Sequence, residues 1–211
     1  MKLLLKIILI SSVFIFTACQ KEIDADIVGD YQPVSFGSEW NYTSSVTGNF
    51  KITSAGTDTS INGRKYYSFD QNTGGTGGII TRLYKSKTNG IYRQFGVAVP
   101  LASSIVMTYL KDTAVGTNWT DTVAVGGVNN YHRYTIVARD GQKVVAGEKY
   151  FKVIEVGYQL SIASPLGGVI NVGSGKNYYA KNIGSVESIL TVGLPGLSFS
   201  DTTQLTGVII K

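Results

Sequence analysis

The placement of glycine and tyrosine constrains the fold of this chain more than any other feature of its sequence. Its 25 glycines lie between short runs rich in tyrosine, valine, isoleucine and threonine, and it has 13 tyrosines. Such runs, separated by turn residues, are typical of antiparallel β-structure. The best helix candidate, Leu101 to Leu110, is apolar on every side and fits a buried strand pair equally well. We therefore expect a mainly β fold.

Two halves of the chain resemble each other, in the same order. Gly37 to Trp40 is echoed by Gly116 to Trp119, Asn62 to Phe69 by Ala146 to Val153, and Tyr84 to Gly90 by Tyr178 to Gly184. The repeat units span roughly 36–92 and 115–187, with Trp40 and Trp119 at equivalent places. We expect an antiparallel curved sheet, a half-barrel or sandwich built from two similar β units. A two-sheet β-sandwich without a repeat is the alternative.

Each unit carries one hairpin signal. Asn62-Gly63 is a strong one because both residues tolerate positive φ, and Ala146-Gly147 is a weaker version. After the second turn the side chains are expected to alternate, as in a strand with one dry face. Phe151 and Val153 then point one way, and Tyr150, Lys152 and Ile154 point the other.

The first 18 residues have the layout of a secretory signal peptide. Lys2 and Lys6 precede an apolar run, and two small residues follow it before Cys19. The run Phe16-Thr17-Ala18-Cys19 resembles a bacterial lipobox, although the usual leucine is replaced by Phe16. The resemblance implies that Cys19 becomes the lipid-bearing first residue of the mature protein, held at the membrane by several acyl chains.

This reading divides the chain into a signal peptide (1–18), a lipidated flexible tether (19–30) and a single β domain (31–211). Gln20-Lys21-Glu22, followed by two aspartates, resembles the short signal that routes some Gram-negative lipoproteins outward across the outer membrane. An ordinary solvated tether is the alternative. With its only cysteine lipidated, the mature chain has no intrachain disulfide.

The charge of the mature chain argues against nucleic-acid binding. Without Lys2 and Lys6, 17 basic side chains stand against 14 acidic ones, a net charge of +3. The longest basic run is the pair Arg64-Lys65, so no basic patch of the kind that binds nucleic acid is predicted.

Two stretches of the mature chain resemble a large set of uncharacterised bacterial lipoproteins. Tyr31 to Tyr42 resembles their Pro-x-x-x-Gly-x-x-Trp-x-Tyr start, and Tyr178 to Gly184 their Tyr-x-Ala-x-x-x-Gly run. The resemblance implies a fold and an envelope location rather than an activity. By weaker analogy, the architecture is similar to the half-barrel of periplasmic lipoprotein carriers, whose concave face takes acyl chains.

The residues with catalytic potential are few. His132 is the only histidine, and no Gly-x-Ser-x-Gly motif presents a nucleophile. One histidine and no free thiol do not make a zinc site, and Asp121 to Asn130 lacks the acidic repeat of a calcium loop. Glu148 and Glu155 have no evident partner for glycoside hydrolysis. We therefore predict no catalytic residue, no metal and no cofactor.

Aromatic side chains and apolar loops are the remaining candidates for function. Trp40, Tyr42, Trp119, Tyr131 and Tyr134 are candidates for a platform that binds sugars or apolar ligands. Core packing of the two repeat units explains the tryptophans equally well and is the interpretation we favour. The loops Ser164 to Val172 and Val192 to Phe199 are apolar, and either rim a ligand mouth or tuck under the sheet.

These observations favour a membrane-anchored, non-catalytic binding module whose ligand is an apolar molecule, a glycan or a protein. A structural envelope component and a glycan-acting hydrolase are the alternatives. The hydrolase requires two carboxylates facing each other in a cleft.

Overall fold

The computed structural model describes residues 29–74, 78–96, 105–164, 167–194 and 197–211, and all regular structure among them is β-strand. The predicted signal peptide, Cys19 and the tether up to residue 28 lie outside the described residues. The strands are β1 (Glu39–Ser44), β2 (Gly48–Ile61), β3 (Arg64–Thr73), β4 (Ile79–Thr88), β5 (Ile91–Phe95), β6 (Val106–Lys111), β7 (Asn118–Val125), β8 (Val128–Val145), β9 (Glu148–Ala163), β10 (Val169–Ala180), β11 (Gly184–Leu194) and β12 (Leu197–Ile209). In the described part of the chain, no helix is long and apolar enough to cross a membrane.

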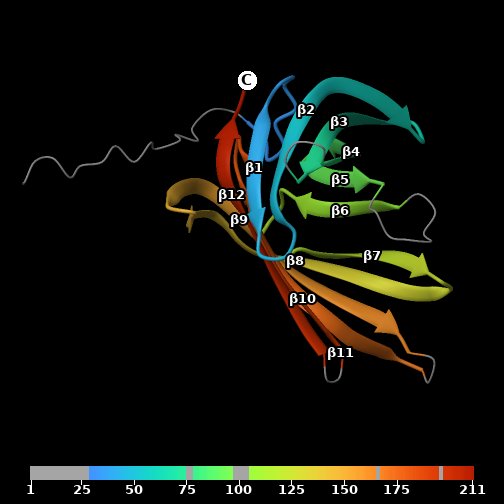
Figure 1. The fold of residues 1–211 in the computed structure, drawn as a ribbon. Coiled ribbons are helices and arrows are strands. Elements are labelled where there is room, and N and C mark those ends of the chain that lie inside the picture. Colours follow the sequence, from blue (N-terminus) through green and yellow to red (C-terminus); the bar gives the residue numbers. More distant parts are fainter. Residues whose placement is uncertain (1–28, 75–77, 97–104, 165–166, 195–196) are drawn as a thin grey trace, which may run out of the picture.

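The twelve strands form one antiparallel, strongly curved sheet (Figure 1). Their order is β6-β5-β4-β3-β2-β1-β12-β11-β10-β9-β8-β7, so two six-strand meanders join where β1 pairs with β12. The sheet curls until its edge strands meet: the indole N–H of Trp119 in β7 donates to the Thr108 carbonyl in β6 over 2.7 Å. The prediction of a mainly β, curved antiparallel sheet is confirmed.

The similar segments of the two halves fall at corresponding points of this strand order. Trp40 and Trp119 are each the second residue of the first strand of a meander. The Asn62-Gly63 turn joins the second and third strands of one half, and Ala146-Gly147 joins those of the other. A shared three-dimensional structure of the units 36–92 and 115–187 stays a prediction.

The Ala146-Gly147 turn provides a test of the hairpin chemistry. Ala146 has a φ of 50° and Asn62 a φ of 51°, and both are exposed. Because alanine is strained at positive φ and asparagine much less so, Ala146→Asn is expected to raise the free energy of unfolding by about 0.5–1 kcal/mol. Asn62→Ala should lower it by a similar amount in the same denaturant titration. A loss of stability in Ala146→Asn would contradict this account.

The far end of the β8–β9 hairpin folds over the sheet instead of extending from it. Its curled end lies beside β12 in Figure 1, and β8 contacts β12. Lys143 of β8 pairs with the buried Glu187 of β11 at 2.6 Å. Bulges produce the bend: the ladder skips Lys152, whose φ is 50°.

That bulge overturns the expected alternation along 150–154. Phe151 pairs with Gln142 and Val153 with Gly141, so Lys152 stands without a partner in the ladder. The extra residue shifts the side chains that follow by one position. Tyr150 and Val153 consequently pack in the same core cluster, whereas Ile154 belongs to a second one.

The core consists of two clusters, one centred on each tryptophan. Trp40 packs on Phe69 with ring centroids 5.9 Å apart, and its indole N–H donates to the Ile183 carbonyl over 2.6 Å. Trp119 stacks on Tyr134 at 5.2 Å in the other cluster. In the apolar run Leu101 to Leu110, residues 106–110 belong to strand β6, Ile105 lies just before it, and 101–104 lie outside the described residues.

Candidate functional site

The curved sheet encloses a cleft made of two adjoining cavities. The first, of about 220 Å³, is lined by Tyr109, Tyr134, Tyr158, Asn177, Tyr179, Ser188, Ile189 and Leu190. The second, of about 270 Å³, is lined by Gln32, Tyr42, Phe50, Ile52, Gln71, Leu83, Lys85, Gln94, Tyr109, Asn177, Tyr179, Ser185, Ser188 and Thr203. They share four lining residues, so we treat them as one interior cleft. Together they reach the ~300–1,000 Å³ typical of small-molecule sites.

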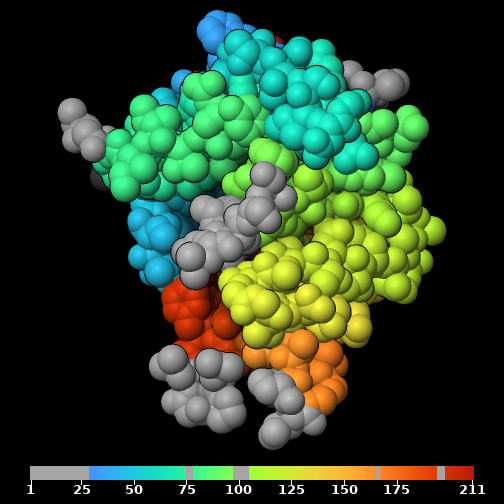
Figure 2. All heavy atoms as spheres, turned by 90° about the vertical axis from the view of Figure 1, so that its right-hand side faces the viewer, coloured from blue at the N-terminus to red at the C-terminus, as the bar shows by residue number. Residues whose placement is uncertain are grey.

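Most strands contribute a side chain to the cleft because strand residues alternate between the two faces of the sheet. The side of the molecule seen in Figure 2 has residues of β2–β5 in its upper half and residues of β7–β10 in its lower half. Among the described residues, every strand except β7 supplies a lining side chain. The interior cleft is therefore a property of the whole sheet.

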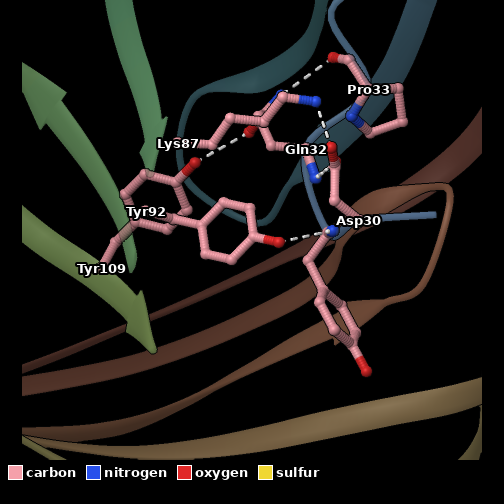
Figure 3. Close-up of polar contacts among 7 residues, drawn as sticks. Asp30, Gln32, Pro33, Lys87, Tyr92 and Tyr109 are labelled. Atoms are coloured by element: carbon pink, nitrogen blue, oxygen red, sulfur yellow. Dashed lines mark hydrogen bonds and ion pairs between the residues drawn. The ribbon is translucent and has the colours of Figure 1, made fainter. Parts of the chain in front are cut away.

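The segment that enters the domain borders this cleft. Asp30 pairs with Lys87 of β4, and its carbonyl accepts a hydrogen bond from Asn182 N over 2.7 Å. The Tyr92 hydroxyl accepts from Tyr31 N over 3.2 Å. Figure 3 shows Lys87 of β4 and Tyr92 of β5 in contact with this segment, together with Tyr109 of β6. Residue 30, assigned to the tether from sequence, thus contacts the folded domain directly.

Gln32 carries this segment into the cleft. It is buried, and its side-chain oxygen accepts hydrogen bonds from the Tyr109 hydroxyl at 3.0 Å and from Lys85 Nζ at 3.4 Å (the first drawn in Figure 3). Because one amide oxygen serves both donors, Gln32 ties the N-terminal segment to β4 and β6 at the wall of the cleft.

Four tyrosines give the cleft a wall that is apolar in its rings and polar at its hydroxyls. They are Tyr109, Tyr134, Tyr158 and Tyr179. Burial raises the pKa of each, that of Tyr158 to about 12 and those of the others further. All four therefore stay protonated at neutral pH and can donate hydrogen bonds. The Tyr158 hydroxyl lies 2.9 Å from His132 Nδ1.

Lys85 is the cationic side chain among the lining residues of the cleft. Its ammonium lies over the rings of Phe69 and Tyr109, 5.4 and 5.7 Å from their centroids. Burial lowers its pKa from 10.5 to about 8. Lys85 keeps some exposed surface, and since it lines the cleft we attribute that surface to the cleft rather than to bulk solvent.

No carboxylate lines either cavity of the cleft. These two cavities therefore lack the pair of acids that glycoside hydrolysis requires. His132 reaches Tyr158, but its pKa is lowered by burial and its ring is neutral at pH 7. Within the described ranges, no three histidine, cysteine, aspartate or glutamate side chains lie close enough together to hold a metal ion.

The cleft takes up two of the five predicted platform residues. Tyr42 lines the larger cavity and Tyr134 the smaller one. Trp40 and Trp119 are buried core residues that donate to carbonyl groups, and Trp119 lies behind Tyr134. Tyr131 is three residues from Tyr134 along an unbroken part of β8 and so lies on the opposite face of that strand.

Sequence reasoning missed Lys85, Gln32 and the tyrosines of β6, β9 and β10. The alternation Leu83-Tyr84-Lys85 in β4 places Lys85 on the same face as an apolar residue, which is a detectable but weak signal. The apolar loops expected at a ligand mouth are described only in part. Val169, Ile170 and Phe199 within them are exposed.

Two solved structures share this fold. A candidate lipoprotein from Parabacteroides distasonis ATCC 8503 matches with a TM-score of 0.56 and 12% identity, over 86% of this chain and 99% of its own. A candidate exported protein with a YmcC-like fold from Bacteroides fragilis NCTC 9343 gives the same values. At this identity the likeness shows the fold alone. No family model and no curated protein sequence matches the chain.

Proposed function

We propose that this protein is a lipid-anchored binding module of the cell envelope, without catalytic activity, whose interior cleft holds a small molecule. The observation that carries the proposal is the cleft itself, lined from eleven strands by aromatic and aliphatic side chains, amides, hydroxyls and one lysine. Apolar walls with a few convergent polar groups are the usual composition of a ligand site. Of the three ligand classes suggested by the sequence, an interior cleft of this volume favours a small apolar molecule or a glycan over a protein.

The envelope location rests on the N-terminal sequence. Lys2 and Lys6, the apolar run and the small residues before Cys19 have the order of a lipoprotein signal. The names of the two structural relatives, a candidate lipoprotein and a candidate exported protein, support the same location. We place the protein at the outer membrane, on its outer face, because Gln20-Lys21-Glu22 resembles an outward-routing signal.

Cys19→Ser is expected to release the protein from membranes. Without the thiol no thioether-linked lipid forms, and each buried acyl methylene that is lost removes about 0.8 kcal/mol of membrane affinity. The measurement is fractionation of cells followed by mass spectrometry of the N-terminus. A Cys19→Ser variant that stays with the membrane fraction as completely as the wild type would refute the anchor.

The binding role is tested by filling the cleft. Ser188 lines both cavities, and phenylalanine at this position would occupy space that a ligand needs. Full-length protein extracted from the membranes that carry it should show a co-purifying small molecule in native mass spectrometry. Ser188→Phe should lose that molecule.

Thr191→Phe is the matched control because Thr191 is exposed on the same strand and three residues further along an unbroken ladder. Its side chain lies on the other face of the sheet, so the variant should retain the molecule. Absence of any bound molecule from the wild type, or its equal loss from both variants, would contradict the proposed function.

A further inference from the structure

Lys85 lies on β4, an interior strand of the sheet, and lines the larger cavity. In the ladder it stands directly opposite Gln94 of β5, and both residues line the cavity. Directly opposite residues of an antiparallel pair lie on the same face, so the register itself directs the ammonium inward.

The charge of Lys85 has no counterpart in the part of the chain that the structure describes. Its polar neighbour is the Gln32 side-chain oxygen at 3.4 Å, which is neutral and is already shared with Tyr109. Five of the other lysines are paired with acids: Lys51, Lys65, Lys87, Lys143 and Lys176 contact Glu39, Asp58, Asp30, Glu187 and Glu155. Lys85 differs from the remaining lysines in lining an interior cavity. Burial is the one cause of the lowered Lys85 pKa, which agrees with the lack of a nearby acid.

An uncompensated charge away from bulk water destabilises a fold, and an anion bound beside it offsets that cost. A single ammonium matches a single negative charge. The neighbouring groups are also those that bind a carboxylate: the amides of Gln71 and Gln94 line the same cavity and, among the described residues, are bonded to no other side chain. A phosphate dianion would call for further cations or a fork of guanidinium donors.

The adjoining cavity provides room for an apolar body. Its wall consists of the tyrosine rings together with Leu190, and it adjoins the Lys85 cavity at the shared residues Tyr109, Asn177, Tyr179 and Ser188. A charged group at Lys85 and an apolar part in the neighbouring cavity thus fit one molecule that spans both.

We propose that the cleft binds a carboxylate-bearing amphiphile, with the carboxylate at the Lys85 ammonium and the apolar part against the tyrosine wall. This inference rests on the proposed function and names the class of ligand. It assigns Lys85 as the residue that selects for the negative charge.

The test compares octanoate with octanamide, which has the same shape without the charge. Full-length protein in a fixed detergent is titrated with each compound by calorimetry at pH 7. Tryptophan emission is followed as well, because one of the two tryptophans, Trp119, stacks on the cleft residue Tyr134. Lys85→Met is measured in the same detergent, so partitioning into micelles cancels in the difference. We expect octanoate to bind at least tenfold more tightly than octanamide, and Lys85→Met to abolish that preference.

Lys87→Met is the control, since Lys87 is engaged by Asp30, and it should keep the preference. Equal binding of both compounds, or a preference that survives Lys85→Met, would overturn the role of Lys85 while leaving the cleft as a binding site. Failure of both compounds to bind would overturn the ligand class. If the co-purifying molecule sought with Ser188→Phe were absent as well, the proposed function itself would fail.

Discussion

Lys85→Met is expected to raise the free energy of unfolding of the ligand-free protein at pH 7 by about 1–2 kcal/mol. A lowering of the lysine pKa from 10.5 to about 8 corresponds to about 3 kcal/mol of unfavourable free energy for the charged form. Loss of the contacts with the Phe69 and Tyr109 rings offsets part of the gain. Methionine has a similar length and no charge to bury, so the balance favours the variant.

The gain has a definite pH dependence. Below pH 8 both the folded and the unfolded protein carry the proton on Lys85, and the full cost of the buried charge is present. Between about pH 8 and 10.5 the folded amine loses its proton while the unfolded one keeps it, so wild-type stability rises relative to Lys85→Met. Above pH 10.5 the amine is deprotonated in both states, so the stability difference between wild type and Lys85→Met no longer changes with pH. Tyr109, the titratable group over which Lys85 lies, stays protonated through most of this range because its pKa is raised well above 10.

Denaturant titrations of both proteins from pH 7 to pH 10.5 measure this difference directly. Lys87→Met serves as the control: its lysine contacts Asp30, so its removal should lower stability. A Lys85→Met protein that is less stable than the wild type at pH 7, with a stability difference that does not change as the pH rises, would show that the buried ammonium does not destabilise the fold. Loss of ligand preference together with a gain in stability would mark Lys85 as a residue kept for binding.

The sequence was sufficient for the fold class because the relevant signals are local. Glycine at tight turns and β-branched or aromatic residues between them predict antiparallel strands without reference to the rest of the chain. Asn62-Gly63 and Ala146-Gly147 were located correctly because positive φ at two successive residues is a local requirement.

The alternation along 150–154 was predicted wrongly because a bulge is a property of two strands. Nothing in the letters Tyr150 to Ile154 shows that Lys152 is skipped by the ladder. The bulge becomes visible only in the pairing of Phe151 with Gln142 and of Val153 with Gly141. The bend that it produces brings the hairpin into contact with β11 and β12, which are distant in the sequence.

The candidate site could be predicted only in part from the sequence, for the same reason. Tyr42 and Tyr134 were among the five aromatic residues considered for a platform, and the closure of the sheet places both in the interior cleft. Lys85 was not found because one lysine in a strand is ordinary. Its significance arises from the absence of an acid around it among the described residues, which depends on strands far apart in the sequence.

The second large effect is expected at the junction of the two sheet edges. Trp119→Ala should lower the free energy of unfolding by about 3–5 kcal/mol, the usual cost of deleting a buried tryptophan side chain. The residue is 8% exposed, stacks on Tyr134 with an interplanar angle of 13°, and donates to the Thr108 carbonyl in β6. Because β6 and β7 share no ladder, this bond and the one from Thr108 N to Asp121 link the edges.

Trp40→Ala is the matched comparison, since Trp40 is 3% exposed and also donates its indole N–H to a carbonyl, but lies in a strand paired on both sides. Both variants should lose similar stability in denaturant. Hydrogen exchange should separate them: amides of β6 and β7 should exchange faster in Trp119→Ala alone, because its loss frees an edge rather than a strand held in two ladders. Trp119→Phe keeps a ring on Tyr134 but loses the hydrogen bond and part of the buried indole, so it should cost less than Trp119→Ala, about 1–2 kcal/mol. Equal exchange of β6 in all three variants would mean that the edges are held together by other contacts, and that Tyr134 keeps its place in the cleft wall without Trp119.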